Sequence, residues 1–148
     1  MTTAEPFRWP VRVYYEDTDA GGIVYYANYL KFLERARTEW LAHAGFALPA
    51  LECEHGVAFV VHRLEIEYRQ PARLYDALQV TLRLLERGRG RLVMAQDVLR
   101  DGAVLARAKV TLACLDRATR RPARNTSCAI LRRPRPRSVS ASVTSSAS

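Results

Sequence analysis

The chain has 148 residues, the usual size of one domain, and carries a formal net charge of +8 from 23 basic and 15 acidic residues. No apolar run approaches the roughly 20 residues that a membrane-spanning helix needs. The first ten residues contain no apolar segment of the kind that signal peptides have, so we expect neither a signal peptide nor a transmembrane segment.

The first predicted elements are a strand, a polar turn and a long helix. Val11, Val13 and Tyr15 alternate with polar residues, which predicts a strand that begins after Pro10. The turn contains two aspartates. Apolar residues then recur at helical spacing from Asn28, a candidate N-cap, to Ala44, and Gly45 is a typical helix end. The apolar stripe comprises Tyr29, Leu30, Leu33, Ala36, Trp40, Leu41 and Ala44.

The second half of the chain predicts strands joined by hairpins. A short helical turn at 49–54 is expected first. Alternation over 57–68 predicts a long strand, and its slip at His62-Arg63 indicates a β-bulge. Three more strands follow at 78–84, 92–99 and 104–115, joined by Gly88-Arg89-Gly90 and by the hairpin signal Asp101-Gly102. The fold class is therefore α+β, with one helix on one face of a curved five-stranded antiparallel sheet whose open edges or faces favour dimerisation.

The end of the chain differs from the rest in charge and composition. Residues 1–116 hold 15 basic and 15 acidic residues, so all the excess charge comes from eight arginines in 117–148. We expect a domain over 1–122 and a basic Arg/Pro/Ser-rich tail over 123–148 that is disordered. A basic tail can contact nucleic acid or acidic lipid. A solvated tail is the favoured interpretation, so no nucleic-acid partner is expected.

The most informative segment is the turn that contains Asp17 and Asp19, followed by Gly21-Gly22 and the helix start. Glycines allow a ligand to approach the backbone, and N–H groups around Ile23 to Tyr26 can bind an oxyanion. A carboxylate nearby can attack an acyl carbon or activate water. This pattern favours acyl transfer or hydrolysis, although a carboxylate in a turn also often serves only to cap it.

Other chemistries have weaker support. His43, His55 and His62 lack metal-ligand spacing, and none is near the turn in sequence. The three cysteines, Cys53, Cys114 and Cys128, are odd in number and far apart, which fits neither a disulfide framework nor a metal motif and is consistent with a reducing cytoplasm. No serine occupies a nucleophile elbow, and no helix follows Gly88-Arg89-Gly90 to make a dinucleotide fingerprint.

The segment from Val11 to Trp40, with its motif Asp-Thr-Asp-Ala-Gly-Gly-Ile-Val-Tyr, resembles the hot-dog-fold acyl-CoA thioesterases. The similarity continues through 57–61, Tyr68 and 71–74, and covers about residues 7 to 122. The nearest branch is the Tol-Pal system-associated thioesterases, and the 4-hydroxybenzoyl-CoA thioesterases are relatives. Many members of that branch carry His at the position of Tyr26, whereas the hydroxybenzoyl relatives carry Tyr.

This resemblance implies a hot-dog fold, an acyl-CoA substrate, a homodimer or homotetramer, and no metal or organic cofactor. The family's catalytic aspartate falls on Asp19, as nucleophile or general base. The backbone N–H of Tyr26 would polarise the thioester carbonyl, and Asp17 would support the turn. The residues expected to bind substrate are Gly21, Gly22, Ile23, Val24 and Asn28.

Two alternatives on the same fold are kept open. The chain could be a non-catalytic scaffold that binds acyl-carrier protein or envelope-assembly partners, with residues 117–148 as an interaction arm. A dehydratase of this fold would usually need an Asp/His pair, and no histidine lies close to the motif in sequence.

Overall fold

The structure, a computed structural model, describes residues 5–44, 56–88 and 90–122. The expected helix end at Gly45, the helical turn at 49–54 and the tail over 123–148 lie outside the described residues, as do His55, Cys53 and Cys128.

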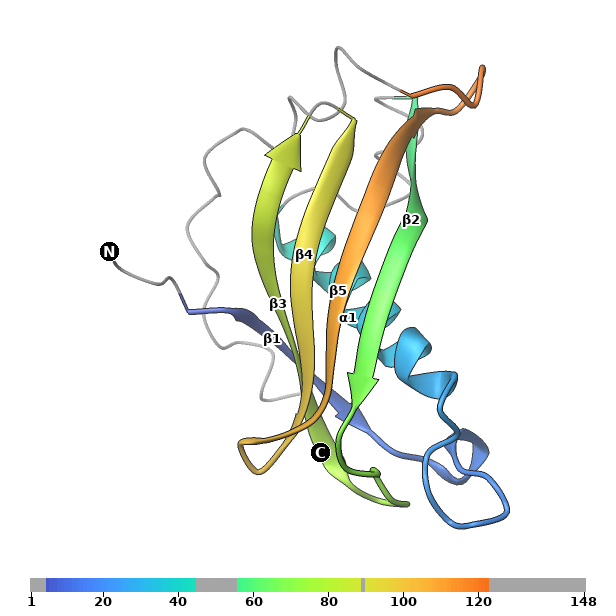
Figure 1. Cartoon of the computed structure of the whole chain (residues 1–148), viewed down its shortest axis with the longest axis vertical. Coiled ribbons are helices and arrows are strands. Elements are labelled where there is room, and N and C mark those ends of the chain that lie inside the picture. The colour runs from blue at the N-terminus through green and yellow to red at the C-terminus, as the bar shows by residue number, and fades with distance from the viewer. Residues whose placement is uncertain (1–4, 45–55, 89, 123–148) are drawn as a thin grey trace.

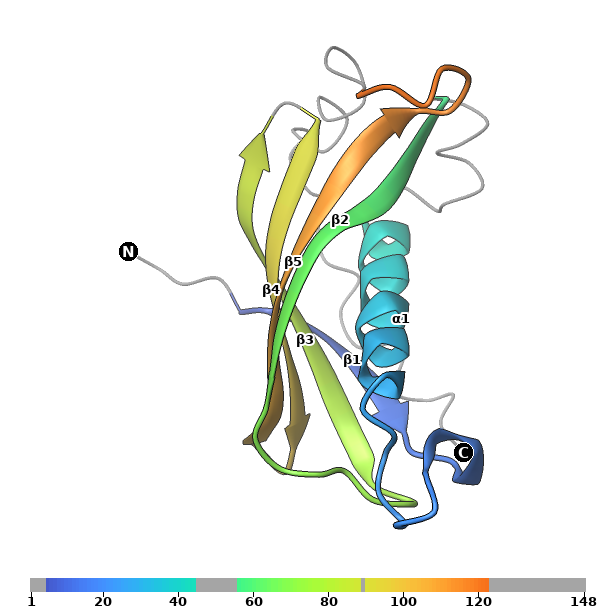
Figure 2. The ribbon, with the colours of Figure 1, turned by 45° about the vertical axis from the view of Figure 1, so that its right-hand side comes forward.

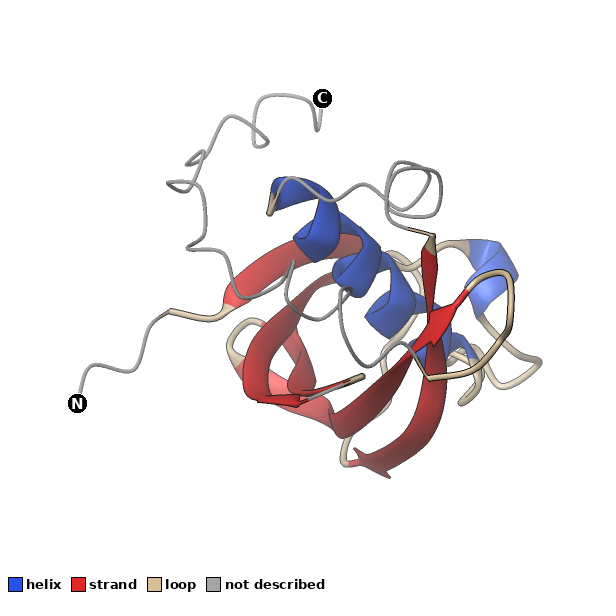
Figure 3. Cartoon of the chain, turned by 90° about the horizontal axis from the view of Figure 1, so that it is seen from above, coloured by secondary structure: helices blue, strands red, loops and turns tan. Residues whose placement is uncertain are grey.

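One helix packs on one face of a five-stranded antiparallel sheet, as the sequence predicts. The element order is β1 (Phe7–Arg12), η1 (Tyr15–Asp17), α1 (Asn28–His43), β2 (Val57–Tyr68), β3 (Ala77–Gly88), β4 (Arg91–Arg100) and β5 (Ala103–Asp116). The strands lie in the order β1-β3-β4-β5-β2, and every neighbouring pair is antiparallel. The sheet twists and curves around α1 (Figures 1, 2 and 3).

The first strand starts earlier than the alternation of Val11, Val13 and Tyr15 indicated. It begins at Phe7 and pairs with β3, from Phe7 opposite Leu82 to Arg12 opposite Ala77. Pro10 lies inside it, which is tolerated because β1 is an edge strand whose outer side needs no donor. Tyr15 belongs to the one-turn 3-10 helix η1 and not to the strand.

The helix buries the expected stripe with two differences. Tyr29, Leu33, Ala36, Trp40 and Leu41 are buried in the core, whereas Leu30 is exposed. Phe32 and Arg37 are buried as well, which the apolar stripe did not predict. No helix in the described part of the chain is long and apolar enough to cross a membrane.

A buried polar pair joins the helix to the middle of the sheet. Arg37 donates a hydrogen bond to Gln96 Oε1 (3.1 Å), and Gln96 donates from Nε2 to the Leu33 carbonyl (3.0 Å). Gln96 is fully buried on β4. Burial lowers the pKa of the Arg37 guanidinium, although Glu34 nearby partly offsets this effect. The pair therefore fixes how α1 sits across β4.

The strand predictions are largely confirmed. The pairing of β2 with β5 shifts register between Val61 and Arg63, at the predicted bulge. Asp101 and Gly102 have φ of 51° and 81°, which is the type I′ conformation of a two-residue hairpin. The inward face of β5 is buried as its alternation indicates, at Ala106, Ala108, Val110, Leu112 and Cys114.

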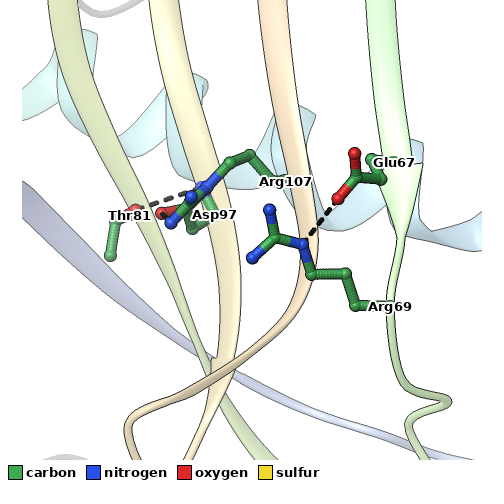
Figure 4. A network of polar contacts seen from close by, with 5 residues as sticks. All are labelled: Glu67, Arg69, Thr81, Asp97 and Arg107. Carbon is green, nitrogen blue, oxygen red and sulfur yellow. Dashed lines mark hydrogen bonds and ion pairs between the residues drawn. The ribbon is translucent and has the colours of Figure 1, made fainter.

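The sheet face away from α1 carries a polar network (Figure 4). Arg107 on β5 donates to both carboxylate oxygens of Asp97 on β4, at 3.0 and 3.2 Å. The Asp97 N–H donates to Thr81 Oγ1 on β3 (3.1 Å), and Arg69 donates to Glu67 (2.6 Å). These contacts are mostly solvent-exposed, so they keep this face polar and add only modestly to stability.

The strand β2 forms one edge of the sheet. It pairs with β5 on one side, and no described strand pairs with its other side. Val60 and Val61 are 42% and 48% exposed on this edge. A long edge strand with exposed apolar side chains is a surface that proteins usually cover.

Candidate active site

The turn with the two aspartates lies between β1 and α1, at the end of the molecule where β2 runs into β3 (Figures 1 and 2). Ile23 forms an isolated bridge with Arg73 of the β2–β3 connection, and the Val24 N–H donates to the Ala72 carbonyl (2.8 Å). The Val13 N–H donates to the Asp76 carbonyl, and the Val13 carbonyl accepts from the Tyr75 N–H (both 3.0 Å). The β2–β3 connection therefore supports the turn along its length.

Asp17 points into the protein and holds the turn together. Its side chain is buried, and Oδ2 accepts a hydrogen bond from the Tyr14 N–H (2.9 Å). Its carbonyl accepts from the Tyr25 N–H (3.0 Å) and from Asn28 Nδ2 (2.9 Å). These contacts link both ends of the turn to the first residue of α1.

Asp19, two residues later, is exposed. Its Oδ1 accepts a hydrogen bond from the Gly21 N–H (2.8 Å), and its carbonyl accepts from the Gly22 N–H (3.0 Å). Gly22 has a φ of +79°, a left-handed conformation that favours glycine. A Cβ on Gly21 would lie 3.2 Å from Asp19 Oδ1. Asp19 Oδ2 accepts no hydrogen bond from another described residue.

The helix start differs from the predicted cap. The N-cap residue is Ala27, and the Asn28 side chain bonds to the Asp17 carbonyl instead of to a helix N–H. The Tyr26 N–H donates to no acceptor within the described part of the chain, and Tyr26 is 62% exposed. A donor that precedes the first turn of a helix lies at the positive end of the helix dipole.

Two tyrosines close to Tyr26, Tyr68 and Tyr29, were not predicted as part of this site. The Tyr68 hydroxyl donates to the Tyr26 carbonyl (2.8 Å), and the Tyr29 hydroxyl accepts from the Ala72 N–H (2.9 Å). The Tyr68 ring meets those of Tyr26 and Tyr29 edge-on, at centroid distances of 6.3 and 5.3 Å. Desolvation raises the pKa of both hydroxyls. Alternation placed Tyr68 on a strand, but no local signal links it to a residue 42 positions away.

The two described histidines, His43 and His62, do not join this site. His43 lies at the last residue of α1, roughly 20 Å along the helix from Asn28. Its Nδ1 is 2.8 Å from the Glu39 carbonyl, and its ring packs against Phe7 and Trp9. His62 lies at the bulge of β2 and forms no hydrogen bond with the described turn. Within the described residues, no group of three His, Cys, Asp or Glu side chains could hold a metal ion.

The chain is similar to known thioesterases over most of its length. The model of the thioesterase-like superfamily matches residues 13–134. "Acyl-CoA thioester hydrolase YbgC" of Escherichia coli is 49% identical over 111 residues, which are 74% of this chain and 82% of that protein. "Acyl-CoA thioesterase YbgC" of Haemophilus influenzae is 45% identical over 116 residues, covering 78% of this chain and 85% of that protein.

Solved structures agree with the sequence relatives. The crystal structure of a probable thioesterase from Bartonella henselae superposes with a TM-score of 0.77 at 34% identity, and covers 81% of this chain and 98% of that one. This chain therefore belongs to the thioesterase-like superfamily and is a thioester hydrolase with the hot-dog fold.

Proposed function

We propose that the chain hydrolyses acyl-CoA thioesters, with Asp19 as the catalytic carboxylate and the Tyr26 N–H as the oxyanion donor. One observation carries the proposal: in the segment between β1 and α1, Asp19 is exposed and the Tyr26 N–H donates to no acceptor among the described residues. The relatives named as acyl-CoA thioesterases support the substrate class.

In the proposed reaction the thioester carbonyl oxygen accepts a hydrogen bond from the Tyr26 N–H. Asp19 either removes a proton from water, whose oxygen attacks the carbonyl carbon, or attacks that carbon itself and forms an anhydride that water then opens. In both routes the carbonyl oxygen becomes an oxyanion, which the helix dipole stabilises. When this oxyanion collapses back to a carbonyl, the C–S bond breaks and CoA leaves as a thiolate; in the nucleophilic route this step forms the anhydride, before water opens it. The thiolate takes up the proton that the attacking water gives up.

The other expected residues have separate proposed roles. Gly21 and Gly22 would let the thioester approach the backbone next to Asp19, and Ile23, Val24 and Asn28 would shape the substrate site. Val24 is buried and the Asn28 amide is bonded to Asp17, so both would act through the shape of the turn. Asp17 would keep its supporting role.

The proposed partner is a second copy of the chain. The exposed edge of β2 supports a homodimer, and homodimers could pair into a tetramer. Asp19 and Tyr26 are both exposed on one protomer, so a second subunit would help to exclude water from the site. Acyl-carrier protein as a partner, a Tol-Pal-associated role, and a cytoplasmic location stay predictions.

A panel of short-chain, long-chain and aromatic acyl-CoAs tests the substrate class. Purified protein is mixed with each compound, and free thiol is followed with a chromogenic thiol reagent. We expect saturable thiol release from at least one member, and the relative kcat/KM values would define the acyl group. A folded protein that binds acyl-CoA or acyl-carrier protein but releases no thiol would contradict hydrolysis and favour the scaffold alternative.

A further inference from the structure

Tyr68 is the last residue of β2, and its side chain contacts the segment that precedes α1. Its hydroxyl donates a 2.8 Å hydrogen bond to the carbonyl of Tyr26, and its ring contacts Tyr26 and Tyr29 edge-on. Tyr68 is 41% exposed, so the contact lies at the surface, beside the turn and not in the core. It joins the sheet to the residue whose N–H is the proposed oxyanion donor.

The Tyr68 hydroxyl takes the place of a helix N–H as the donor to the Tyr26 carbonyl. In a longer helix this carbonyl would accept from the N–H of Leu30, four residues on. Here the Leu30 N–H donates to the Ala27 carbonyl instead (3.1 Å), and the Asn28 N–H donates to the Tyr25 carbonyl (2.8 Å). The start of α1 is therefore a tight turn at 25–28, and the Tyr68 hydroxyl occupies the carbonyl that would otherwise let the helix extend backwards.

We propose that Tyr68 is a positioning residue for the thioesterase reaction: by holding the Tyr26 carbonyl, its hydroxyl fixes the peptide group after Tyr26 and so limits the backbone rotation that would turn the Tyr26 N–H, which belongs to the peptide group before it. The inference rests on the proposed function, because it concerns the same oxyanion donor. A donor that points away from the developing oxyanion loses its value, since such hydrogen bonds depend on a prearranged geometry.

The ring and the hydroxyl of Tyr68 must be tested separately. Tyr68→Phe keeps the ring contacts with Tyr26 and Tyr29 and removes only the hydrogen bond. Tyr75→Phe is the matched control, because Tyr75 is an exposed tyrosine of the β2–β3 connection whose hydroxyl makes no hydrogen bond with the described residues.

For Tyr68→Phe we expect kcat to fall about tenfold while KM stays within about twofold, because a misdirected catalytic group costs rate more than binding. The midpoint of thermal unfolding should change by no more than about 3 °C, since the bond is at the surface. Tyr75→Phe should match the wild type in all three quantities.

A second readout does not require activity. In ¹⁵N-labelled protein the amide resonance of Tyr26 should shift in Tyr68→Phe and not in Tyr75→Phe. If the wild type releases no thiol, the proposed function fails, and the amide resonance alone then decides the positioning role. An unchanged Tyr26 resonance, an unchanged kcat, or a fall in kcat matched by a large loss of thermal stability would each overturn the proposal.

Discussion

At the scale of residues, the two aspartates of the turn have opposite environments. In the sequence Asp17 and Asp19 look equivalent. In the structure η1 turns the chain between Tyr15 and Asp17, so Asp17 is buried against the Tyr14 N–H and Asp19 is left at the surface. The two residues therefore have different tasks for a geometrical reason: one carboxylate has its hydrogen bonds inside the turn, and the other keeps an oxygen for solvent or substrate.

The space beside Asp19 gives a testable prediction. In Gly21→Ala the new Cβ would lie 3.2 Å from Asp19 Oδ1, so the carboxylate must move by a few tenths of an ångström. We expect kcat for thioester hydrolysis to fall about tenfold with little change in thermal stability. Gly88→Ala is the control, because its nearest contact would be an ordinary 3.8 Å. Equal rates for the two variants would argue against a role for the Asp19 carboxylate position.

At the scale of elements, the buried Arg37–Gln96 pair sets how the helix lies on the sheet. Gln96→Leu removes the acceptor of a buried guanidinium, so we expect the free energy of unfolding in urea to fall by about 2–3 kcal/mol. The double variant Arg37→Met/Gln96→Leu should recover most of this loss, because both partners are then apolar.

The exposed Gln79 on β3 provides a control for that measurement. Gln79→Leu should change the free energy of unfolding by less than about 0.5 kcal/mol. A double variant no more stable than Gln96→Leu would show that the single substitution acts through packing and not through an unpaired Arg37.

The elements themselves were largely predictable from sequence, because each has a local signal. Helical spacing identified α1, the slip at His62-Arg63 identified the bulge, and Asp101-Gly102 identified a hairpin. The features that the sequence did not predict depend on contacts between segments that are far apart in the chain. Pro10 suggested that β1 starts after it, yet pairing with β3 extends that strand back to Phe7. Arg37 has a charged side chain, and its hydrogen bond with Gln96, a residue 59 positions away, helps to explain its burial.

Within the candidate site, the motif predicts the turn, the helix start and the two aspartates because these residues are contiguous, and their catalytic roles stay predictions. Tyr68 and Tyr29 were not predicted as part of this site, because their contacts join segments that are far apart in the chain. The Tyr68 hydroxyl donates to the Tyr26 carbonyl from β2, and the Tyr29 hydroxyl accepts from the Ala72 N–H, 43 positions away. Asn28 was taken as a helix cap from its residue type, but the Asp17 carbonyl is the partner of its side chain.

At the scale of the whole molecule, the single chain exposes Asp19 and Tyr26 of the candidate site and Val60 and Val61 of the β2 edge. If copies associate through this edge, a charge on it should separate them. We expect Val61→Lys to shift the protein towards monomer in sedimentation velocity and to lower thiol release, because Val61 is 48% exposed on β2.

Leu85→Lys is the control for the association experiment. Leu85 is 49% exposed on β3, away from the β2 edge, at a register shift in the pairing with β4 and beyond the part of β3 that pairs with β1. It should sediment as the wild type does. A monomeric wild type, or a Val61→Lys protein with unchanged sedimentation and activity, would contradict association through β2.

In the proposed reaction Asp19 performs the chemistry of thioester hydrolysis. The most direct measurement is thiol release by Asp19→Asn from the best acyl-CoA of the panel, compared with Asp101→Asn. The control makes the same substitution in the β4–β5 hairpin, where asparagine followed by glycine suits the turn. We predict that kcat of Asp19→Asn falls at least about 100-fold while Asp101→Asn matches the wild type. An Asp19→Asn protein that releases thiol as fast as the wild type would contradict the account.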